Sequence, residues 1–303
     1  GADAAVQAEI ERLLNVIFPD PERIVLYSEP EPAVGSSREI ENEEICRELW
    51  ASGFPTNQVI ICFVESEFSA GDRKIRVYVP KALQGDPQIE AAKQAFAEAI
   101  PLAVQSFSQY GVIQRDIQIV FSMLPSSKKG VLAMTYWPSK DAWPAESGEP
   151  CTILTYPTGY AEPSDELKHI VIHEMFHCFQ MDNLDVLPYT DKGYQATKWW
   201  IEGSAEYFTH LALQPDNVKA QLLKNRVKKF ESDSLNESIV DIGHENYVFF
   251  QYLSDEAVMG KQGIIDFLKT VDGTALQNRD AQAGVLADYP DMNELFHTFG
   301  QMF

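Results

Sequence analysis

The chain has 303 residues, and 45% of them are hydrophobic, which is enough to bury one large core or two modest lobes. Its formal net charge of −21 creates a field that repels a phosphate backbone, so nucleic acid is not an expected partner. No apolar run approaches the roughly 20 residues that a helix needs to cross a bilayer, so no transmembrane segment is predicted.

The first half of the chain alternates between helix and strand patterns. Apolar residues recur at helical spacing over 4–18 and 86–111, and Asp86 is the expected N-cap of the second helix, with Gly111 beyond its end. Runs rich in β-branched and aromatic residues predict strands at residues 22–28, 57–66, 73–80, 116–124, 130–137 and 151–157.

After residue 163 the pattern becomes nearly all helical. A helix is predicted over 163–184, with Ser164 as N-cap and Glu166 in its first turn. Further helices are predicted at residues 197–213, 216–232, 246–258, 261–271 and 291–302. This order predicts an α+β fold in which a sheet-containing lobe (1–163) and a helical lobe (164–303) form a single unit with a cleft between them.

One stretch, residues 219–230, is clearly basic. It is interpreted as a helix with a solvated cationic face, and a docking site is the alternative.

The four cysteines are Cys46, Cys62, Cys151 and Cys178, and none forms a C-x-x-C pair, so a cysteine-rich structural zinc site is not predicted. Two disulfides in an exported protein and four buried thiols fit the count equally well. Cys178 directly follows His177 and therefore points about 100° away from it around a helix, so it is not counted as a metal ligand.

Residues 173–180 read HEMFHCFQ, with two histidines four positions apart and a glutamate after the first. On a helix His173 and His177 share one face and present their imidazoles to the same point. A hydrolytic zinc ion takes three protein ligands and leaves one position for water, whose proton Glu174 is placed to accept. The pattern predicts such a site with a third ligand downstream; the alternative is an ordinary amphipathic helix.

Three completions of the ligand set are known for this motif. The HExxHxxGxxH form is excluded, because the chain has Gln180 and Asn183 where a glycine and a histidine are required. A GTxxD-type turn is not matched around Asp191. A glutamate from the next helix remains, and residues 199–208 read WWIEGSAEYF.

With these two motifs in order, the chain resembles the gluzincin metallopeptidases of the peptidase MA clan, whose second helix reads W-x-x-E-G-x-A-x-Y. The resemblance covers about residues 165–270 and implies a zincin-like fold with one Zn²⁺ per chain, held by His173, His177 and Glu202 in the cleft between the lobes. Glu202 follows His177 by 25 positions, against about twenty in this clan. Glu206 is expected to bond the outer nitrogen of a ligand histidine; the alternative exchanges the roles of the two glutamates.

A donor for the substrate oxyanion is also implied. In M1-type aminopeptidases a tyrosine that opens a later helix has this role, and Tyr247 matches it, although Phe250 stands where a glycine is usual. Thermolysin-like relatives use a histidine instead, which makes His244 the alternative donor. A third interpretation is that Tyr247 is only an interfacial aromatic near a helix start. His169 is interpreted as a packed or hydrogen-bonded residue, because a catalytic site keeps one position open.

The resemblance implies a zinc-dependent peptidase in which Glu174 takes a proton from water and passes it to the leaving amine. A peptide or protein substrate is expected to pair with an edge strand at 151–159. The G-x-M-E-N segment with which M1-type aminopeptidases capture a free amine is not matched, which favours an endopeptidase.

The alternatives are a catalytically silent zincin-fold binding protein and a zinc hydrolase of a non-peptide amide or ester. The usual location of proteins of this clan, the acidic composition and the even cysteine count favour an extracellular or periplasmic protein whose signal peptide is absent from this sequence.

Overall fold

The structure is a computed structural model that describes residues 44–50, 58–70, 73–122, 126, 130–136, 150–184, 191–213, 221–234, 236–272, 279–289 and 291–302. The helix predicted at 4–18 and the strand predicted at 22–28 lie outside these residues.

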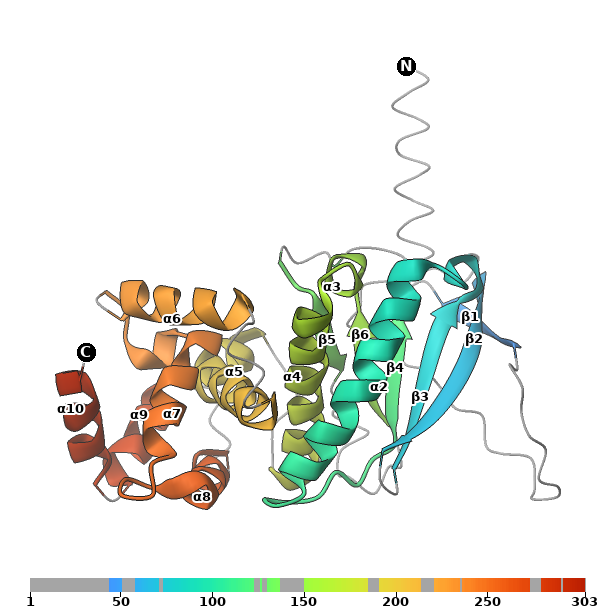
Figure 1. Ribbon diagram of the computed structural model, residues 1–303. Coiled ribbons are helices and arrows are strands. Elements are labelled where there is room, and N and C mark those ends of the chain that lie inside the picture. Colours follow the sequence, from blue (N-terminus) through green and yellow to red (C-terminus); the bar gives the residue numbers. More distant parts are fainter. Residues whose placement is uncertain are drawn as a thin grey trace.

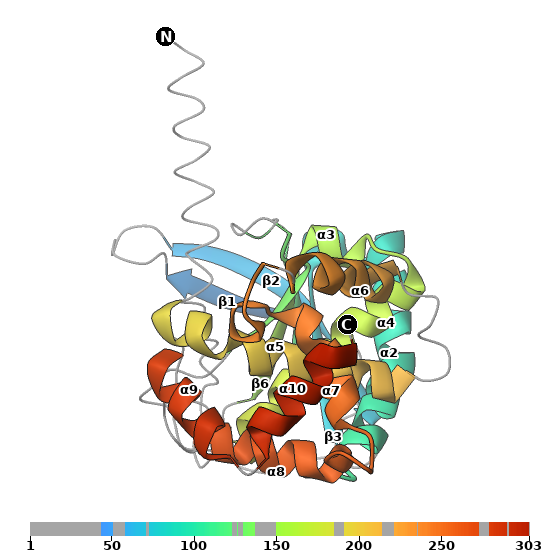
Figure 2. The same cartoon turned by 90° about the vertical axis from the view of Figure 1, so that its left-hand side faces the viewer.

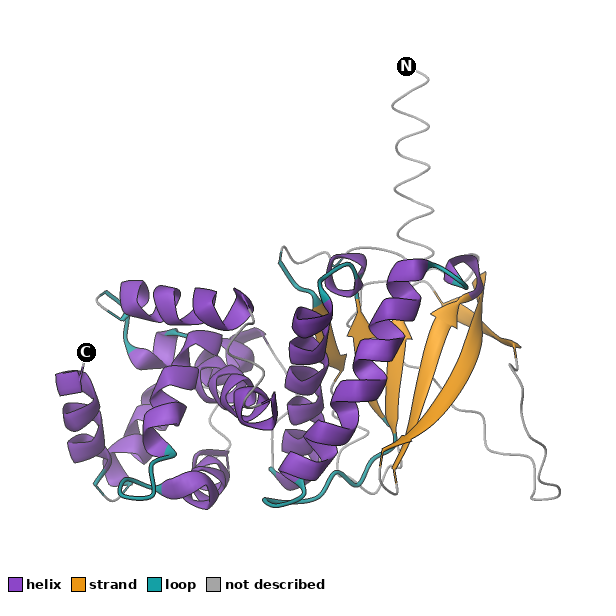
Figure 3. Ribbon diagram, in the orientation of Figure 1, coloured by secondary structure: helices purple, strands orange, loops and turns teal. Residues whose placement is uncertain are grey.

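The described strands form one six-stranded sheet in the order β1-β2-β3-β4-β6-β5. Its strands are β1 (Glu44–Trp50), β2 (Gln58–Ala70), β3 (Arg73–Pro80), β4 (Ile117–Phe121), β5 (Ala133–Tyr136) and β6 (Cys151–Thr155). β3, β4 and β6 run parallel, whereas β1, β2 and β5 pair antiparallel with their neighbours. The strands gather in the N-terminal half of the molecule and helices fill the C-terminal half, which agrees with the predicted α+β class (Figure 3).

The expectation that 151–159 forms an edge strand is wrong. β6 lies between β4 and β5, and its register with β5 runs from Ala133↔Thr155 to Tyr136↔Thr152. The strand ends at Thr155, and Pro157 begins the short helix α3 (Pro157–Tyr160). Because the preceding segment folds back along the outer side of β6, the edge on this side of the sheet is β5.

Three helices pack in succession on one side of the sheet (Figure 1). They are α2 (Pro87–Phe107), α4 (Ser164–Asn183) and α5 (Asp191–Leu213), and α4 contacts both of the others and also β5. α4 is buried on every side through most of its length, because the sheet and α2 cover one face and α5 covers the other. The side chains of this helix are therefore shielded from water even where they are polar.

The starts of the predicted helices were partly right. Asp86 caps α2, and its carboxylate accepts a hydrogen bond of 2.8 Å from the backbone N–H of Gln88. The N-cap of α4 is Pro163, not Ser164, and it makes no side-chain capping bond. Ser164 instead has helical backbone angles, and Asp165 and Glu166 in this first turn interact favourably with the positive end of the helix dipole.

An aromatic cluster sets the position of these three helices. Phe107 from α2, Phe176 from α4 and Phe208 from α5 are all 1% exposed or less. Their ring centroids lie 5.2 Å (Phe107–Phe176), 4.6 Å (Phe176–Phe208) and 6.5 Å (Phe107–Phe208) apart. Such contacts add to the free energy of burial and favour one relative placement of the helices. Because Phe176 directly precedes His177, this packing also positions the histidine helix against α5.

The remaining helices surround α5 on the side away from the sheet (Figure 2). They are α6 (Gln221–Asp233), α7 (Tyr247–Leu253), α8 (Gly260–Asp272), α9 (Arg279–Asp288) and α10 (Met292–Met302), with 3₁₀ turns at Lys81–Leu83 (η2), Ile239–Asp241 (η6) and His244–Asn246 (η7). The helix predicted at 246–258 is shorter, because it ends at Leu253 with Ser254 as C-cap, and α9 and β1 were not predicted. None of the described helices has the length and apolarity needed to cross a membrane.

A disulfide joins the sheet to the histidine helix. Cys151 opens β6, Cys178 lies in α4, and their Cα atoms are 5.7 Å apart. The four-thiol alternative is therefore wrong for this pair, and Cys178 is not available as a metal ligand. Closing a loop of 27 residues removes unfolded-chain entropy worth about 3.5 kcal/mol in the polymer model. Cys46 and Cys62 lie opposite each other in the β1–β2 register.

Candidate metal centre

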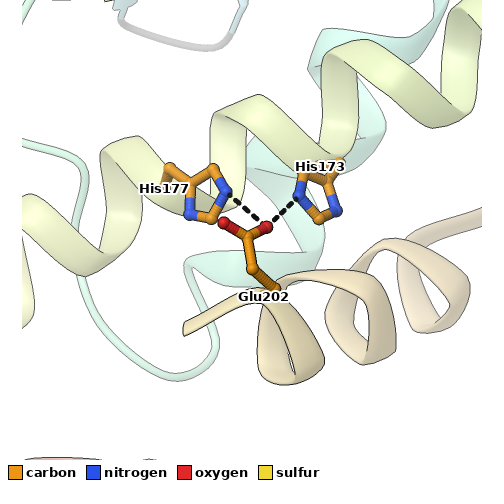
Figure 4. A group of neighbouring side chains, drawn as sticks. All are labelled: His173, His177 and Glu202. Atoms are coloured by element: carbon orange, nitrogen blue, oxygen red, sulfur yellow. Dashed lines mark hydrogen bonds and ion pairs between the residues drawn. The ribbon is translucent and has the colours of Figure 1, made fainter. Parts of the chain in front are cut away.

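The two motif histidines and a glutamate from the following helix meet where α4 packs against α5 (Figure 4). Nε2 of His173 lies 3.1 Å from Oε2 of Glu202, and Nε2 of His177 lies 3.5 Å from the same oxygen. The i, i+4 spacing places both imidazoles on one face of α4, as the helical period requires. Each of the three residues is only 6–7% exposed.

The donor set and its spacing fit a zinc ion. Tetrahedral zinc in proteins forms bonds of about 2.0–2.2 Å to histidine nitrogen and carboxylate oxygen, so its ligand atoms lie about 3.3–3.6 Å from one another. The two distances to Glu202 are 3.1 and 3.5 Å, and the three donor atoms all lie within 4.8 Å of one another. Two imidazoles and one carboxylate also leave a fourth position for water or substrate.

The second glutamate of the motif lies on the other side of His173. Oε2 of Glu206 is 3.2 Å from Nδ1 of His173, whereas Glu202 is close to Nε2. The other oxygen of Glu206 bonds Nε2 of His169 at 2.9 Å, so His169 is hydrogen-bonded, as predicted. The two carboxylates therefore contact opposite nitrogens of one imidazole. A carboxylate on the outer nitrogen favours the tautomer whose Nε2 is free to bind a metal.

His177 has a different partner for its outer nitrogen. Nδ1 of His177 lies 2.8 Å from Oε1 of Gln180. The amide nitrogen of Gln180 donates to the carbonyl of Ile201 at 3.1 Å and to the hydroxyl of Ser204 at 3.0 Å. Because both donors of the amide are engaged by α5, its oxygen is the atom that faces His177, and His177 must donate from Nδ1. In the sequence Gln180 served only to exclude the HExxHxxGxxH pattern, and its contact with His177 was not predicted.

The glutamate of the HExxH motif is held by a strand of the sheet. Glu174 is 7% exposed, and its Oε2 accepts a hydrogen bond of 2.6 Å from the hydroxyl of Thr135. Thr135 lies in β5, the edge strand, and is 4% exposed. Nothing in the sequence singled out this threonine, since it precedes the motif by 38 positions and belongs to no recognised pattern.

The two candidate oxyanion donors lie in different surroundings. Nε2 of His244, in η7, is 3.1 Å from Oε2 of Glu202, and its side chain is 33% exposed. The ring of His244 stacks on that of His173, with centroids 5.1 Å apart. Tyr247 is 7% exposed, and burial, with the charge of Glu206 nearby, raises its pKa to about 12. The structure thus brings His244 to the candidate ligands and leaves it partly accessible.

Charge interactions inside the site shift several pKa values. Burial disfavours the charged form of His173, but the carboxylates of Glu202 and Glu206 outweigh burial and raise the pKa of His173 to about 10. Burial also opposes ionisation of both glutamates, yet the neighbouring histidines hold their pKa values well below the ordinary value. The two glutamates are therefore anionic at neutral pH and favour a positive charge between them. A proton on His173 supplies that charge in the metal-free chain, and a divalent cation that displaces the proton supplies it too.

Part of the basic helix α6 faces this network rather than solvent. Nε of Arg226 lies 3.6 Å from Glu206, and its Nη1 lies 3.5 Å from Glu245 in η7. Lys229 bonds Glu245 at 2.9 Å. Burial opposes ionisation of Glu245, but the bond from Lys229 and the charge of Arg226 lower its pKa. The prediction of a solvated cationic face for residues 219–230 is therefore wrong for Arg226, whose side chain is 27% exposed and contacts two carboxylates.

No protein-family model and no curated protein matches the chain. Solved structures similar to it include an aminopeptidase N family protein and an M1 zinc metallopeptidase. The aminopeptidase N family protein from Idiomarina loihiensis has a TM-score of 0.48 and 11% identity over 84% of this chain and 52% of that chain. The M1 zinc metallopeptidase from Deinococcus radiodurans has a TM-score of 0.43 and 9% identity over 85% of this chain and 60% of that chain. This chain thus spans about half the length of the first protein, and its function has to be judged from its own residues.

Proposed function

We propose that the chain is a zinc-dependent hydrolase that cleaves peptide bonds, a metallopeptidase of the gluzincin type. One observation carries the proposal: Nε2 atoms of two histidines lie 3.1 and 3.5 Å from one carboxylate oxygen of the next helix, in a buried site. His173, His177 and Glu202 would hold one ion per chain. When bound, zinc supplies the positive charge that acidifies a water molecule and polarises a carbonyl group.

Glu174 is the residue that we assign to proton transfer. It follows His173 directly, so its side chain is rotated about 100° from that ligand around the helix and stays clear of the ligand set. From there its carboxylate accepts a proton as water attacks the peptide carbonyl and delivers it to the leaving nitrogen. The proton returns to a product atom, so Glu174 ends the reaction as it began.

His244 is the residue that we assign to the developing oxyanion, with Tyr247 as the alternative. A donor for this role has to reach the substrate, and the side chain of His244 is 33% exposed at 3.1 Å from Glu202. Burial lowers the pKa of His244 despite the nearby Glu202 carboxylate, so its imidazole is neutral at pH 7 and has one N–H group. In the metal-free chain this N–H faces the Glu202 oxygen at 3.1 Å, and it would become available to the oxyanion once Glu202 binds the ion.

The substrate is proposed to be an extended peptide segment that pairs with β5. Among the described strands β5 is the edge of the sheet next to α4, and an edge strand offers unpaired backbone N–H and C=O groups to a peptide. An internal segment fits better than a free N-terminus, because the sequence has no match to the amine-capturing G-x-M-E-N segment. We therefore propose an endopeptidase.

The proposal is tested by metal analysis and peptide cleavage on the same preparations. Purified wild type, Glu174→Gln and Glu202→Gln are loaded with zinc, dialysed and measured by inductively coupled plasma mass spectrometry. Wild type and Glu174→Gln are expected to retain one zinc per chain, and Glu202→Gln to lose it. A mixed peptide library read by mass spectrometry should be cut at internal bonds by wild type, in a chelator-sensitive way, and not by Glu174→Gln.

Three outcomes would overturn parts of this proposal. If the wild-type protein retains no zinc, the proposed metal site is wrong. Unchanged turnover by Glu174→Gln removes this residue from proton transfer. If the protein hydrolyses simple esters or amides in a zinc-dependent way and leaves the peptide library uncut, it is a hydrolase of non-peptide substrates and not a peptidase.

A further inference from the structure

A threonine of the edge strand contacts the carboxylate that we assign to proton transfer. The hydroxyl of Thr135 lies 2.6 Å from Oε2 of Glu174 and 3.0 Å from the backbone carbonyl of the same residue. A hydroxyl has one proton to donate, and the contact to the carboxylate is the shorter. Its length is typical of a charge-assisted O–H···O⁻ bond, the stronger kind of hydrogen bond in proteins.

The geometry around Thr135 restricts both partners of this bond. Its branched Cβ restricts its χ1 angle in a strand, so the direction of the hydroxyl is largely set by the backbone of β5. Thr135 is 4% exposed, and water therefore competes little for the bond. The bond engages Oε2 of Glu174 rather than Oε1.

We propose that Thr135 is a positioning residue for Glu174: it holds one carboxylate oxygen so that the other is aimed at the attacking water. This inference rests on the proposed role of Glu174 in peptide hydrolysis. The bond also connects Glu174 to the edge of the sheet. Successive side chains of a strand point to opposite faces, and Thr135 is the residue of β5 that reaches α4 at Glu174. A peptide paired with β5 would therefore be placed in register with the base.

The test substitutes Thr135 by valine, which keeps the shape and removes the hydroxyl. Losing a hydrogen bond to an ionised group should lower kcat about 10- to 100-fold and leave KM and zinc affinity within about twofold of wild type. Thr135→Ser keeps the hydroxyl and should recover most of the activity. In the Glu174→Gln background, Thr135→Val should cause no further loss, since the two residues act through one bond.

A matched control lies in the neighbouring strand. Thr155 of β6 is 0% exposed, and its hydroxyl has no hydrogen-bond partner among the described residues. Thr155→Val removes the same group from the same sheet, one strand further in, and should leave kcat unchanged. A loss of activity in Thr155→Val as large as that in Thr135→Val would mean that sheet packing, not the bond to Glu174, is responsible, and the proposal would be wrong.

A second measurement does not depend on turnover. Crystal structures of zinc-loaded Thr135→Val and Thr135→Ser should show the Glu174 carboxylate displaced or in two conformers in the first variant and in its wild-type position in the second. If wild type cleaves no peptide, the proposed function fails while this comparison still decides the positioning role. A Glu174 carboxylate that keeps one unchanged position in Thr135→Val, or full kcat in that variant, overturns the inference.

Discussion

Replacing Glu206 by glutamine separates the roles of the two glutamates that lie close to His173. The side chain of Glu206 is 1% exposed, and its oxygens lie 2.9 Å from His169, 3.2 Å from His173 and 3.6 Å from Arg226. Glutamine keeps the shape but removes the charge and turns one acceptor into a donor. That new N–H group must face a nitrogen that previously had an acceptor.

The expected magnitude follows from what each carboxylate contacts. Loss of a hydrogen-bonding partner behind a ligand histidine typically reduces metal affinity 10- to 100-fold, or about 1.4–2.7 kcal/mol. Glu206 should fall in this range, because His173 and His177 still have Glu202 close to their Nε2 atoms, at 3.1 and 3.5 Å. Glu202→Gln removes the anionic donor itself and should weaken binding far more.

The assay is competition for zinc against a chromophoric chelator of known affinity. Wild type, Glu206→Gln and Glu202→Gln are compared at one pH and ionic strength, with Glu294→Gln, an exposed position on α10, as the control for loss of a negative charge. A loss in Glu206→Gln that equals the loss in Glu202→Gln would refute the reasoning and show that Glu206 is itself a ligand. An unchanged zinc affinity in Glu206→Gln would also refute the reasoning, because it would show that Glu206 does not support metal binding through His173.

Two further predictions concern stability. In Gly203→Ala the new Cβ would lie 2.8 Å from Cβ of Asn246, so α5 and η7 must separate, and the free energy of unfolding measured with urea should fall by about 1–3 kcal/mol. Gly284→Ala is the control, because there is open space around Gly284, and it should be neutral or stabilising. A larger loss of stability in Gly284→Ala than in Gly203→Ala would contradict this prediction. Despite burial, the hydrogen bond from Lys229 lowers the pKa of Glu245 in the folded protein below its ordinary value of 4.5. The ionised carboxylate therefore stabilises the folded protein fully above pH 4.5, and this stabilisation is lost as the pH falls through the lower pKa of the folded state. Glu245→Gln should therefore be less stable by about 1–2 kcal/mol near neutral pH, with the difference narrowing below pH 4.5; a constant difference across that range would count against the ion pair.

The histidine helix shows how much local pattern can establish. The spacing of His173 and His177 required only that the segment be helical, and helicity follows from the apolar period of that segment. Glu202 was expected from a second local motif, and the structure brings all three residues together. Their assigned roles stay predictions until metal binding is measured.

The errors and omissions concern relations between elements. Residues 151–155 form a strand as predicted, but its neighbours were not predictable, because strand order depends on how β5 folds back along it. Thr135 and Gln180 are ordinary residues in sequence and become important through a bond to Glu174 and a bond to His177. Arg226 looked solvated because its own helix is basic, whereas its partners come from α5 and η7.

For this protein, the sequence alone determined the types of most elements, the division into a sheet-containing and a helical half, and the set of candidate ligands. These properties depend on residues a few positions apart, whose relative directions are set by the periods of helix and strand. Only the tertiary structure decided which strand is the edge, which oxygen faces which nitrogen, and which side chain restrains Glu174. Those relations join residues tens of positions apart, and the packing of buried side chains between elements selects them.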